Sequence, residues 1–453
     1  MALLVGPASG PLAGAEAERW TLSVTLRQTL SDNVFLTPER SREAITGGTL
    51  SLSYGRIKGG SSFSAGGWLG GQHFYRFGTY DRAQFGLNTS ARIALAPRAR
   101  LRLGAGYTNG LNVESLRSSR LGLPQVTVQS GSASVGLDYT LGAGTSADLG
   151  LDGAGIVYRA KLLVDSSQLP GDTFVPADAV AAGPPPGINM GPPSAPDETL
   201  QVLGLLTAEG LQTLNLDFAT WRASLGLAHE FSPRTRISVG GDYRRTYEKP
   251  RTFSEGEQVG GQVALRQVLD SSANVALAYG YQENRFGIRL RTHSFTAQVE
   301  KAIGKKVRLD ATLGSSYLQG PERASSSWTA VGGGGLSAQF RRSWLALRYT
   351  RSRYQGLIVG RSQIADLAYA NLTHAVGRRV SIAGYGYYRD ARDPLDPRFS
   401  FRTTLGGASL GVGIKQRTSA GVSYSYLRYD PRSSPAVQRS VLSMFLSYAR
   451  QMK

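Results

Sequence analysis

The stretch KKVRLDATLGSSYLQGP, residues 305–321, alternates between apolar and polar side chains over most of its length. The apolar series is Val307, Leu309, Ala311 and Leu313, and the polar series is Arg308, Asp310, Thr312 and Gly314. A period of two residues is that of a β-strand with one apolar and one polar face. The stretch begins in a basic turn and has Tyr317 near its other end. It therefore predicts an amphipathic strand.

The same pattern recurs along the chain, in residues 101–107, 237–243, 275–281 and 420–426. Tight-turn sequences recur at intervals of about 35 to 45 residues, with one longer interval of about 90 residues. They lie near residues 57–58, 97–98, 142–145, 233–234, 270–272, 304–305, 341–342, 377–378 and 415–417. Longer polar connections, such as residues 319–325 and 392–398, lie between these turns.

Nine tight turns, with both chain ends on the same side, make ten hairpins and thus 20 strands, with 18 as the alternative count. We expect the first strand over residues 20–34. An even strand number with short turns at one end and longer loops at the other is typical of outer-membrane barrels. A propeller also repeats at about 40 residues, but each blade needs four short strands. We therefore predict an all-β fold: a transmembrane antiparallel up-and-down β-barrel with periplasmic termini.

Composition limits the other classes of protein. The 453 residues include no cysteine, which excludes disulfides and cysteine-based catalytic or metal sites. No run of about 20 apolar residues is present, so no transmembrane helix is expected. Phosphate-binding and nucleophile-elbow motifs are missing, and the four histidines are scattered without metal-ligand spacing. We expect no enzymatic activity, no metal and no cofactor.

Two segments differ from the strand pattern. Residues 1–15 are apolar and end in Ala-Gly-Ala, which predicts a signal peptide with a truncated basic start, so that residues 16–453 form the single barrel. Residues 163–210 are acidic and rich in proline and glycine, and predict a long extracellular loop with a short helix. We interpret this loop as a lid or constriction, with Asp197 and Glu198 at the helix start and Leu203 and Leu206 packed against the inner wall. A disordered external loop is the alternative.

The apolar series of each strand must face lipid, because a spanning barrel leaves no other apolar surroundings for it. The alternate series then faces a water-filled lumen, as in barrels of 16 or more strands. The charged residues expected to line the pore are Arg92, Arg102, Arg222, Arg244, Arg266, Arg308, Arg348, Asp138, Asp152, Asp242 and Asp310. These charges either neutralise one another across neighbouring strands, or they produce an electric field across the pore that orients an anionic or polyhydroxylated solute.

The net charge of +19 fits scattered turn arginines or a cation-lined channel; the arginines are dispersed, so no nucleic acid is expected. Tyrosines collect at the strand ends away from the tight turns, and an interfacial aromatic girdle explains most of them. They are Tyr107, Tyr243, Tyr247, Tyr281, Tyr317, Tyr354, Tyr388, Tyr426 and Tyr429. Inward rings among Tyr385, Tyr387 and Tyr354 are an alternative set of stacking surfaces for sugars.

The segments LSDNVF, residues 30–35, and ITGGTLSLSY, residues 45–54, resemble a family of bacterial outer-membrane β-barrel porins that accompany exopolysaccharide export loci. The resemblance implies a wide outer-membrane barrel that passes polysaccharide from the periplasm. Outer-membrane barrels usually end in an aromatic residue, whereas here Tyr448 is the last aromatic and Lys453 ends the chain.

We accordingly expect an outer-membrane channel that is a conduit for the export of surface polysaccharide. A passive diffusion porin for small anionic or sugar solutes is the alternative, and a barrel enzyme or structural anchor is a third reading. The expected partners are outer-membrane lipid and lipopolysaccharide, together with polysaccharide and periplasmic export components.

Overall fold

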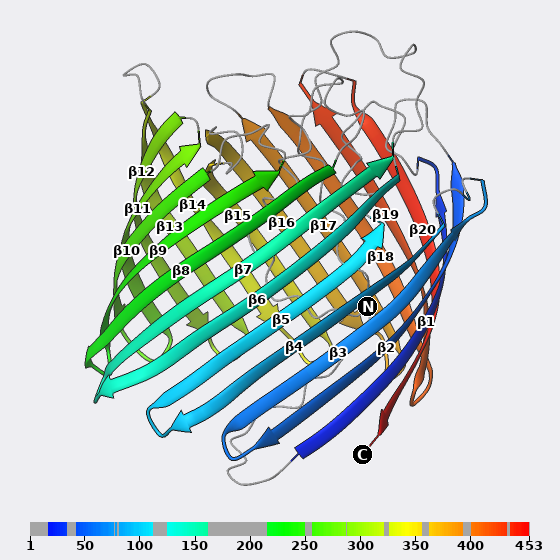
Figure 1. Ribbon diagram of the computed structural model, residues 1–453, viewed down its shortest axis with the longest axis horizontal. Coiled ribbons are helices and arrows are strands. Elements are labelled where there is room, and N and C mark those ends of the chain that lie inside the picture. The colour runs from blue at the N-terminus through cyan, green and yellow to red at the C-terminus, as the bar shows by residue number, and fades with distance from the viewer. Residues whose placement is uncertain are drawn as a thin grey trace.

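A single 20-stranded antiparallel sheet closes on itself to form a barrel in the computed structural model (Figure 1). The structure describes residues 17–33, 42–76, 78, 81–111, 125–161, 215–249, 256–286, 288–320, 326–355, 362–392, 400–432 and 435–452. Within these residues no helix is long and apolar enough to cross a membrane. The fold class and the strand number predicted from the sequence are both confirmed.

The strands follow the chain in order around the barrel. Their bounds are β1 (Ala17–Ser31), β2 (Glu43–Lys58), β3 (Ser61–Phe74), β4 (Arg82–Ala96), β5 (Ala99–Leu111), β6 (Gln125–Gly142), β7 (Thr145–Lys161), β8 (Asn215–Ser232), β9 (Thr235–Lys249), β10 (Gly256–Val268), β11 (Ala273–Phe286), β12 (Ile288–Ile303), β13 (Val307–Gln319), β14 (Ser327–Gln339), β15 (Ser343–Gln355), β16 (Ser362–Ala375), β17 (Val380–Arg392), β18 (Phe401–Lys415), β19 (Thr418–Pro431) and β20 (Val437–Met452). The alternating stretch that contains Leu309 and Asp310 forms β13.

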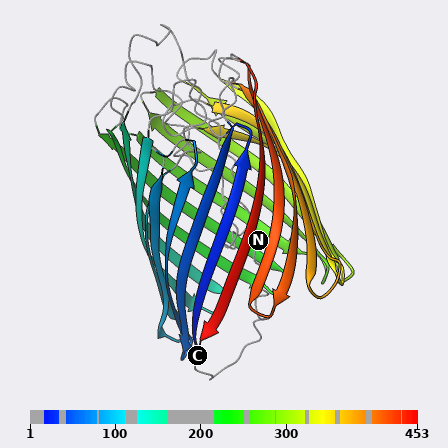
Figure 2. The ribbon, with the colours of Figure 1, turned by 90° about the vertical axis from the view of Figure 1, so that its right-hand side faces the viewer.

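Closure comes from pairing of β1 with β20, from Trp20 opposite Met452 to Ser31 opposite Val441. Figure 2 shows these two strands side by side, with the start of β1 and the end of β20 at the same end of the barrel as the tight turns. All nine predicted turns join consecutive strands. The turn between β2 and β3 uses Gly59 and Gly60, whose φ angles of 57° and 79° are ones that glycine adopts without strain.

The first strand is slightly displaced from its predicted position, and two predicted segments lie outside the described residues. The first strand begins at Ala17 and ends at Ser31, so it starts and stops about three residues before the predicted bounds. The predicted signal peptide, residues 1–15, lies wholly outside the described residues. So do the acidic loop and its proposed lid residues Asp197, Glu198, Leu203 and Leu206.

The register assigns the two faces of the sheet, because paired residues on neighbouring antiparallel strands share a face. In β11 and β12, exposed Leu277 and Phe295 belong to one series, while Gly280 and Ser294 belong to the other. The first series is apolar around the barrel and forms the outer surface. Its exposed members include Leu50, Leu149, Leu225, Val263, Leu313, Leu410 and Leu446.

One ladder is shorter than its neighbours. The pairing of β14 with β15 runs from Gln339 opposite Trp344 only to Gly332 opposite Arg351, which leaves residues 327–331 without ladder partners on β15. The guanidinium of Arg353 lies across this gap. It donates to the Ser327 carbonyl oxygen at 3.3 Å, to Ser327 Oγ at 3.1 Å and to Thr329 Oγ1. A side chain thus satisfies a backbone acceptor that the ladder leaves unpaired.

Gly332 marks the point where this ladder ends, with a φ of 154°. A Cβ at this position would collide with the carbonyl oxygen of Thr312, which is backbone and cannot move aside cheaply. We expect Gly332→Ala to lower the free energy of unfolding by about 1–3 kcal/mol, the usual cost of a disfavoured backbone conformation. The midpoint of urea unfolding, read from the electrophoretic shift between folded and unfolded barrel, measures this change.

Gly386 is the matched control for this substitution. It also lies within a strand, β17, but a Cβ there would meet no atom within 4 Å. Gly386→Ala should leave the unfolding midpoint unchanged. Equal midpoints for both variants would contradict the requirement for glycine at position 332.

Candidate pore

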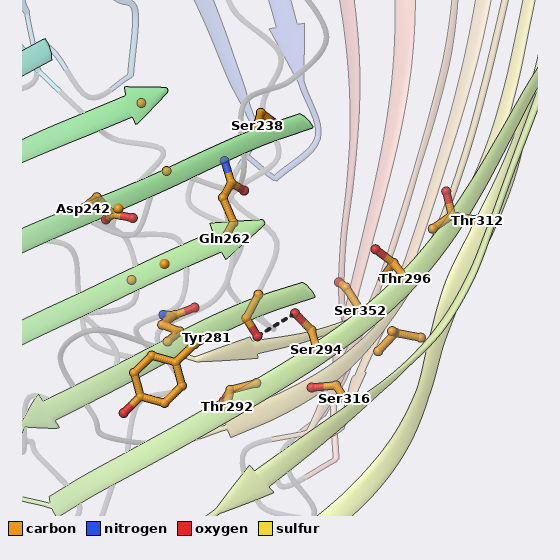
Figure 3. A pocket seen from close by; sticks show the side chains of 18 of the residues that line it. Ser238, Asp242, Gln262, Tyr281, Thr292, Ser294, Thr296, Thr312, Ser316 and Ser352 are labelled. Carbon is orange, nitrogen blue, oxygen red and sulfur yellow. Dashed lines mark hydrogen bonds between the residues drawn. The ribbon is translucent and has the colours of Figure 1, made fainter. Parts of the chain in front are cut away.

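The polar face of β7 to β15 lines a cavity of about 750 Å³. A single cavity can touch the same face of this many consecutive strands only where the sheet is concave, so the polar face is the inside of the barrel. In Figure 3, Ser238 and Asp242 of β9, Gln262 of β10 and Thr296 of β12 lie around this space. The wall is made of hydroxyl, amide and charged groups, which suits a water-filled interior.

The register places all eleven predicted pore residues in the inward series. They are Arg92, Arg102, Arg222, Arg244, Arg266, Arg308, Arg348, Asp138, Asp152, Asp242 and Asp310. Arg222, Asp242, Asp310 and Arg348 also line the cavity itself. The lid residues, by contrast, belong to the part of the chain that is not described.

Several of these charges form ion pairs across the inner wall. Nη2 of Arg102 lies 2.8 Å from Oδ1 of Asp138, between β5 and β6. Nε of Arg222 lies 3.4 Å from Oδ2 of Asp242, between β8 and β9. The interpretation that inward charges partly neutralise one another therefore holds for these residues. Longer pairs join Arg348 to Asp310 at 3.8 Å and Arg266 to Glu300 at 3.8 Å.

Arginines nevertheless exceed carboxylates on the inward face of the described strands. Arg92 lies directly opposite Arg102, and neither Arg92 nor Arg308 has an ion-pair partner among the residues described. Beyond the eleven residues given above, the inward arginines are Arg19, Arg27, Arg100, Arg236, Arg389 and Arg439, and the inward carboxylates include Glu43, Asp148, Glu230 and Glu300. The described part of the wall therefore carries a net positive charge, and a positive surface favours anions.

The inner wall of β16 to β18 is aromatic. Tyr369 of β16 lies directly opposite Tyr387 of β17, and both belong to the inward series. Tyr385 is also inward, and its ring lies over Gly407 of β18, where a Cβ would collide with it. The side chain of Tyr354 lies outside what the structure describes. Of the three tyrosines considered as stacking surfaces, two therefore point into the barrel.

A continuous row joins the charged and the aromatic parts of this wall. The register places Asp310, Gly335, Arg348, Tyr369 and Tyr387 in line across β13 to β17. Nδ2 of Asn371 donates to Tyr369 Oη at 2.8 Å and holds that ring. Tyr369 was not among the predicted pore residues, although its spacing of two residues from the polar Asn371 assigns it to the inward series.

An outward row of rings crosses four strands towards the loop end of the barrel. Tyr281, His293, Tyr317 and Trp328 are register partners, with ring centroids 5.2, 6.4 and 4.8 Å apart in that order. This is the predicted girdle in one sector of the barrel. Tyr429 departs from it, because it lies in the inward series and packs against Phe401 with only 3% of its surface exposed. Tyr429 lies five residues from outward-facing Tyr424 in the same strand, and side chains an odd number of residues apart point to opposite faces of a sheet.

Comparisons with known proteins give the fold but no family. No protein-family model matches the chain, and no curated protein matches it in sequence. Among solved structures, the siderophore receptor PirA from Pseudomonas aeruginosa is similar with a TM-score of 0.51 and 10% identity, over 95% of this chain and 80% of that one. A variant of the ferric enterobactin receptor PfeA from Pseudomonas aeruginosa gives a TM-score of 0.54 and 8% identity, over 95% and 81%. The copper transporter OprC gives 0.52 and 9%, over 96% and 81%.

The protein is a β-barrel of the bacterial outer membrane. These structural neighbours are receptors and transporters, and this chain has the fold of such outer-membrane channels and transporters. Identities of about one residue in ten carry no information on the solute. The described residues contain no group of histidines and carboxylates arranged to hold a metal ion.

Proposed function

We propose that this barrel is a conduit for anionic saccharides, and that it exports surface polysaccharide from the periplasm. The observation that carries the proposal is the row of Asp310, Arg348, Tyr369 and Tyr387 along the inner wall. Aromatic rings offer flat apolar surfaces for the C–H faces of sugars, while arginine binds carboxylate groups through paired N–H donors. Both kinds of group lie together on the surface that a passing chain would contact.

The membrane orientation follows from loop length. Short turns of outer-membrane barrels are periplasmic and longer loops are extracellular. We infer that the tight turns and both described chain ends of this protein face the periplasm. Arg92 and Arg102 sit nearer to the tight turns than to the loops, so a polyanion coming from the periplasm would meet them early.

Deleting the gene in its host tests export. We expect polysaccharide to be lost from the cell surface and to accumulate in the periplasm, with both changes reversed by the intact gene. An unchanged amount of surface polysaccharide would contradict the proposal.

A passive porin for small anionic or sugar solutes is the second candidate, and the net positive charge of the wall supports it equally. Swelling of liposomes containing the purified barrel separates the two. Free uptake of small sugars and amino acids at similar rates favours the passive porin. Little uptake of these solutes, together with current blockades by anionic oligosaccharides, favours the conduit.

A further inference from the structure

A cluster of arginines lies on the outside of the barrel, where β9 to β12 approach the loops. Arg285 of β11 pairs in register with Arg289 of β12, and Glu283 with Arg291. These residues continue the series of exposed Leu277 and Phe295, so they face away from the lumen. Charged groups on the outer surface of a membrane barrel are costly within the hydrocarbon layer and need a polar partner there.

Glu283 holds these arginines together. Its side chain is only 6% exposed, and Arg289 binds it with Nε at 2.7 Å from Oε1 and Nη2 at 2.9 Å from Oε2. Nε of Arg285 donates to Oε1 at 2.7 Å, and Nε of Arg291 donates to Oε2 at 3.1 Å. The hydroxyl of Tyr281 adds a further donor at 2.7 Å. The carboxylate therefore fixes three guanidinium groups side by side.

The cluster keeps an excess of positive charge. Glu257 is the second carboxylate, and it lies 3.8 Å from Arg285 and 3.9 Å from Arg245. The three arginines around Glu283 thus face two glutamates, one of which they share with Arg245. Within the described residues, the Nη groups of Arg285 and Arg291 make no hydrogen bond, although each arginine has five N–H donors. These donors remain available to an anion.

The depth of the cluster identifies the kind of anion. The outward ring row of Tyr281, His293, Tyr317 and Trp328 marks the boundary of the hydrocarbon layer. Glu283 and Arg291 lie two residues beyond Tyr281 and His293, which is about 7 Å along a strand. The arginines are therefore at the level of lipid headgroups, directly above the apolar surface of Leu277 and Phe295.

We propose that this cluster binds the phosphorylated headgroup of lipid A in the outer leaflet, with the acyl chains lying against the apolar face below. The inference relies on the membrane orientation given above, which places the loops and this cluster outside. Guanidinium groups match phosphate oxygens with paired, charge-assisted hydrogen bonds. Because Glu283 already positions the three arginines, little side-chain entropy remains to be lost on binding.

A second outward charged patch provides the control. It contains Arg392 and Arg402 around Asp390, with Arg351 beside Asp366 and Arg428 beside Asp430. Here aspartates nearly balance the arginines. Arg402→Gln is therefore a substitution on the same surface that should not affect lipid A binding.

The test is a lipid titration of the full-length barrel in detergent, followed by native mass spectrometry. For the double variant Arg289→Gln/Arg291→Gln we expect the dissociation constant of bisphosphorylated lipid A to rise about tenfold or more, given the strength of charged hydrogen bonds. Glu257→Gln should lower the dissociation constant of lipid A, because it removes a carboxylate that competes with the phosphate for the arginines. A folding defect cannot produce this opposite change, and the heat-dependent gel shift verifies folding of each variant.

Several results would overturn the proposal. Unchanged affinity in the double variant, or equal binding of fully dephosphorylated lipid A, would show that the arginines do not bind the phosphates. Equal binding of phosphatidylglycerol would overturn the assignment to lipid A. If inorganic phosphate displaced lipid A at equal concentration, the acyl chains would contribute nothing to binding, and the proposed contact with the apolar face would be wrong.

Discussion

Replacing Arg244, Arg266 and Arg308 with serine is expected to lower the anion-to-cation permeability ratio of the open pore about threefold or more. All three side chains belong to the inward series, and the intact wall carries more arginines than carboxylates. Arg308 has no ion-pair partner among the described residues. Loss of Arg266 also leaves the Glu300 carboxylate, 3.8 Å away, without that cation, so part of the wall changes from a neutral pair to a negative charge.

Reversal potentials in planar bilayers under a salt gradient measure this ratio. The intact protein should prefer anions, and the preference should weaken at high salt, because the screening length falls from about 10 Å at 0.1 M to about 3 Å at 1 M. Arg428→Gln is the control, since this arginine faces outward beside Asp430. Cation preference in the intact protein would refute the expected field.

The alternating pattern of the sequence was enough to predict the barrel. A strand such as β13 separates lipid from water, so the side chains of residues 307–314 alternate between apolar and polar. The same parity assigned Arg308 and Asp310 to the lumen. Parity also assigns Arg285, Arg289 and Arg291 to the outer face, at the loop end of their strands.

Features that depend on register could not be predicted. Arg348 and Tyr369 come together because the β15–β16 hairpin closes at a particular residue pair, and a shift of one residue would move every side chain of a strand to the opposite face. The sequence also does not predict that the β14–β15 ladder ends at Gly332. The contact by which Arg353 satisfies the Ser327 carbonyl also depends on this ladder end.

Replacing Tyr385 and Tyr387 with alanine is expected to shorten the residence time of oligosaccharides in the pore roughly tenfold. Both rings face the lumen, and Tyr387 continues the row of Asp310, Arg348 and Tyr369. Each ring should contribute about 0.5–1.5 kcal/mol by stacking on a sugar, and about 1.4 kcal/mol corresponds to a tenfold change. Durations of current blockade at a fixed concentration of an anionic oligosaccharide give the residence time.

Tyr388 is the matched control, because it neighbours Tyr387 in the same strand but faces outward with 40% of its surface exposed. Tyr388→Ala should leave blockade durations unchanged. The double variant should also keep its anion preference, since no charge is removed, which separates the role of the rings from that of the arginines. If the rings only fill space, their removal would raise conductance without shortening the blockades, and the inner wall would then bind saccharides through its arginines alone.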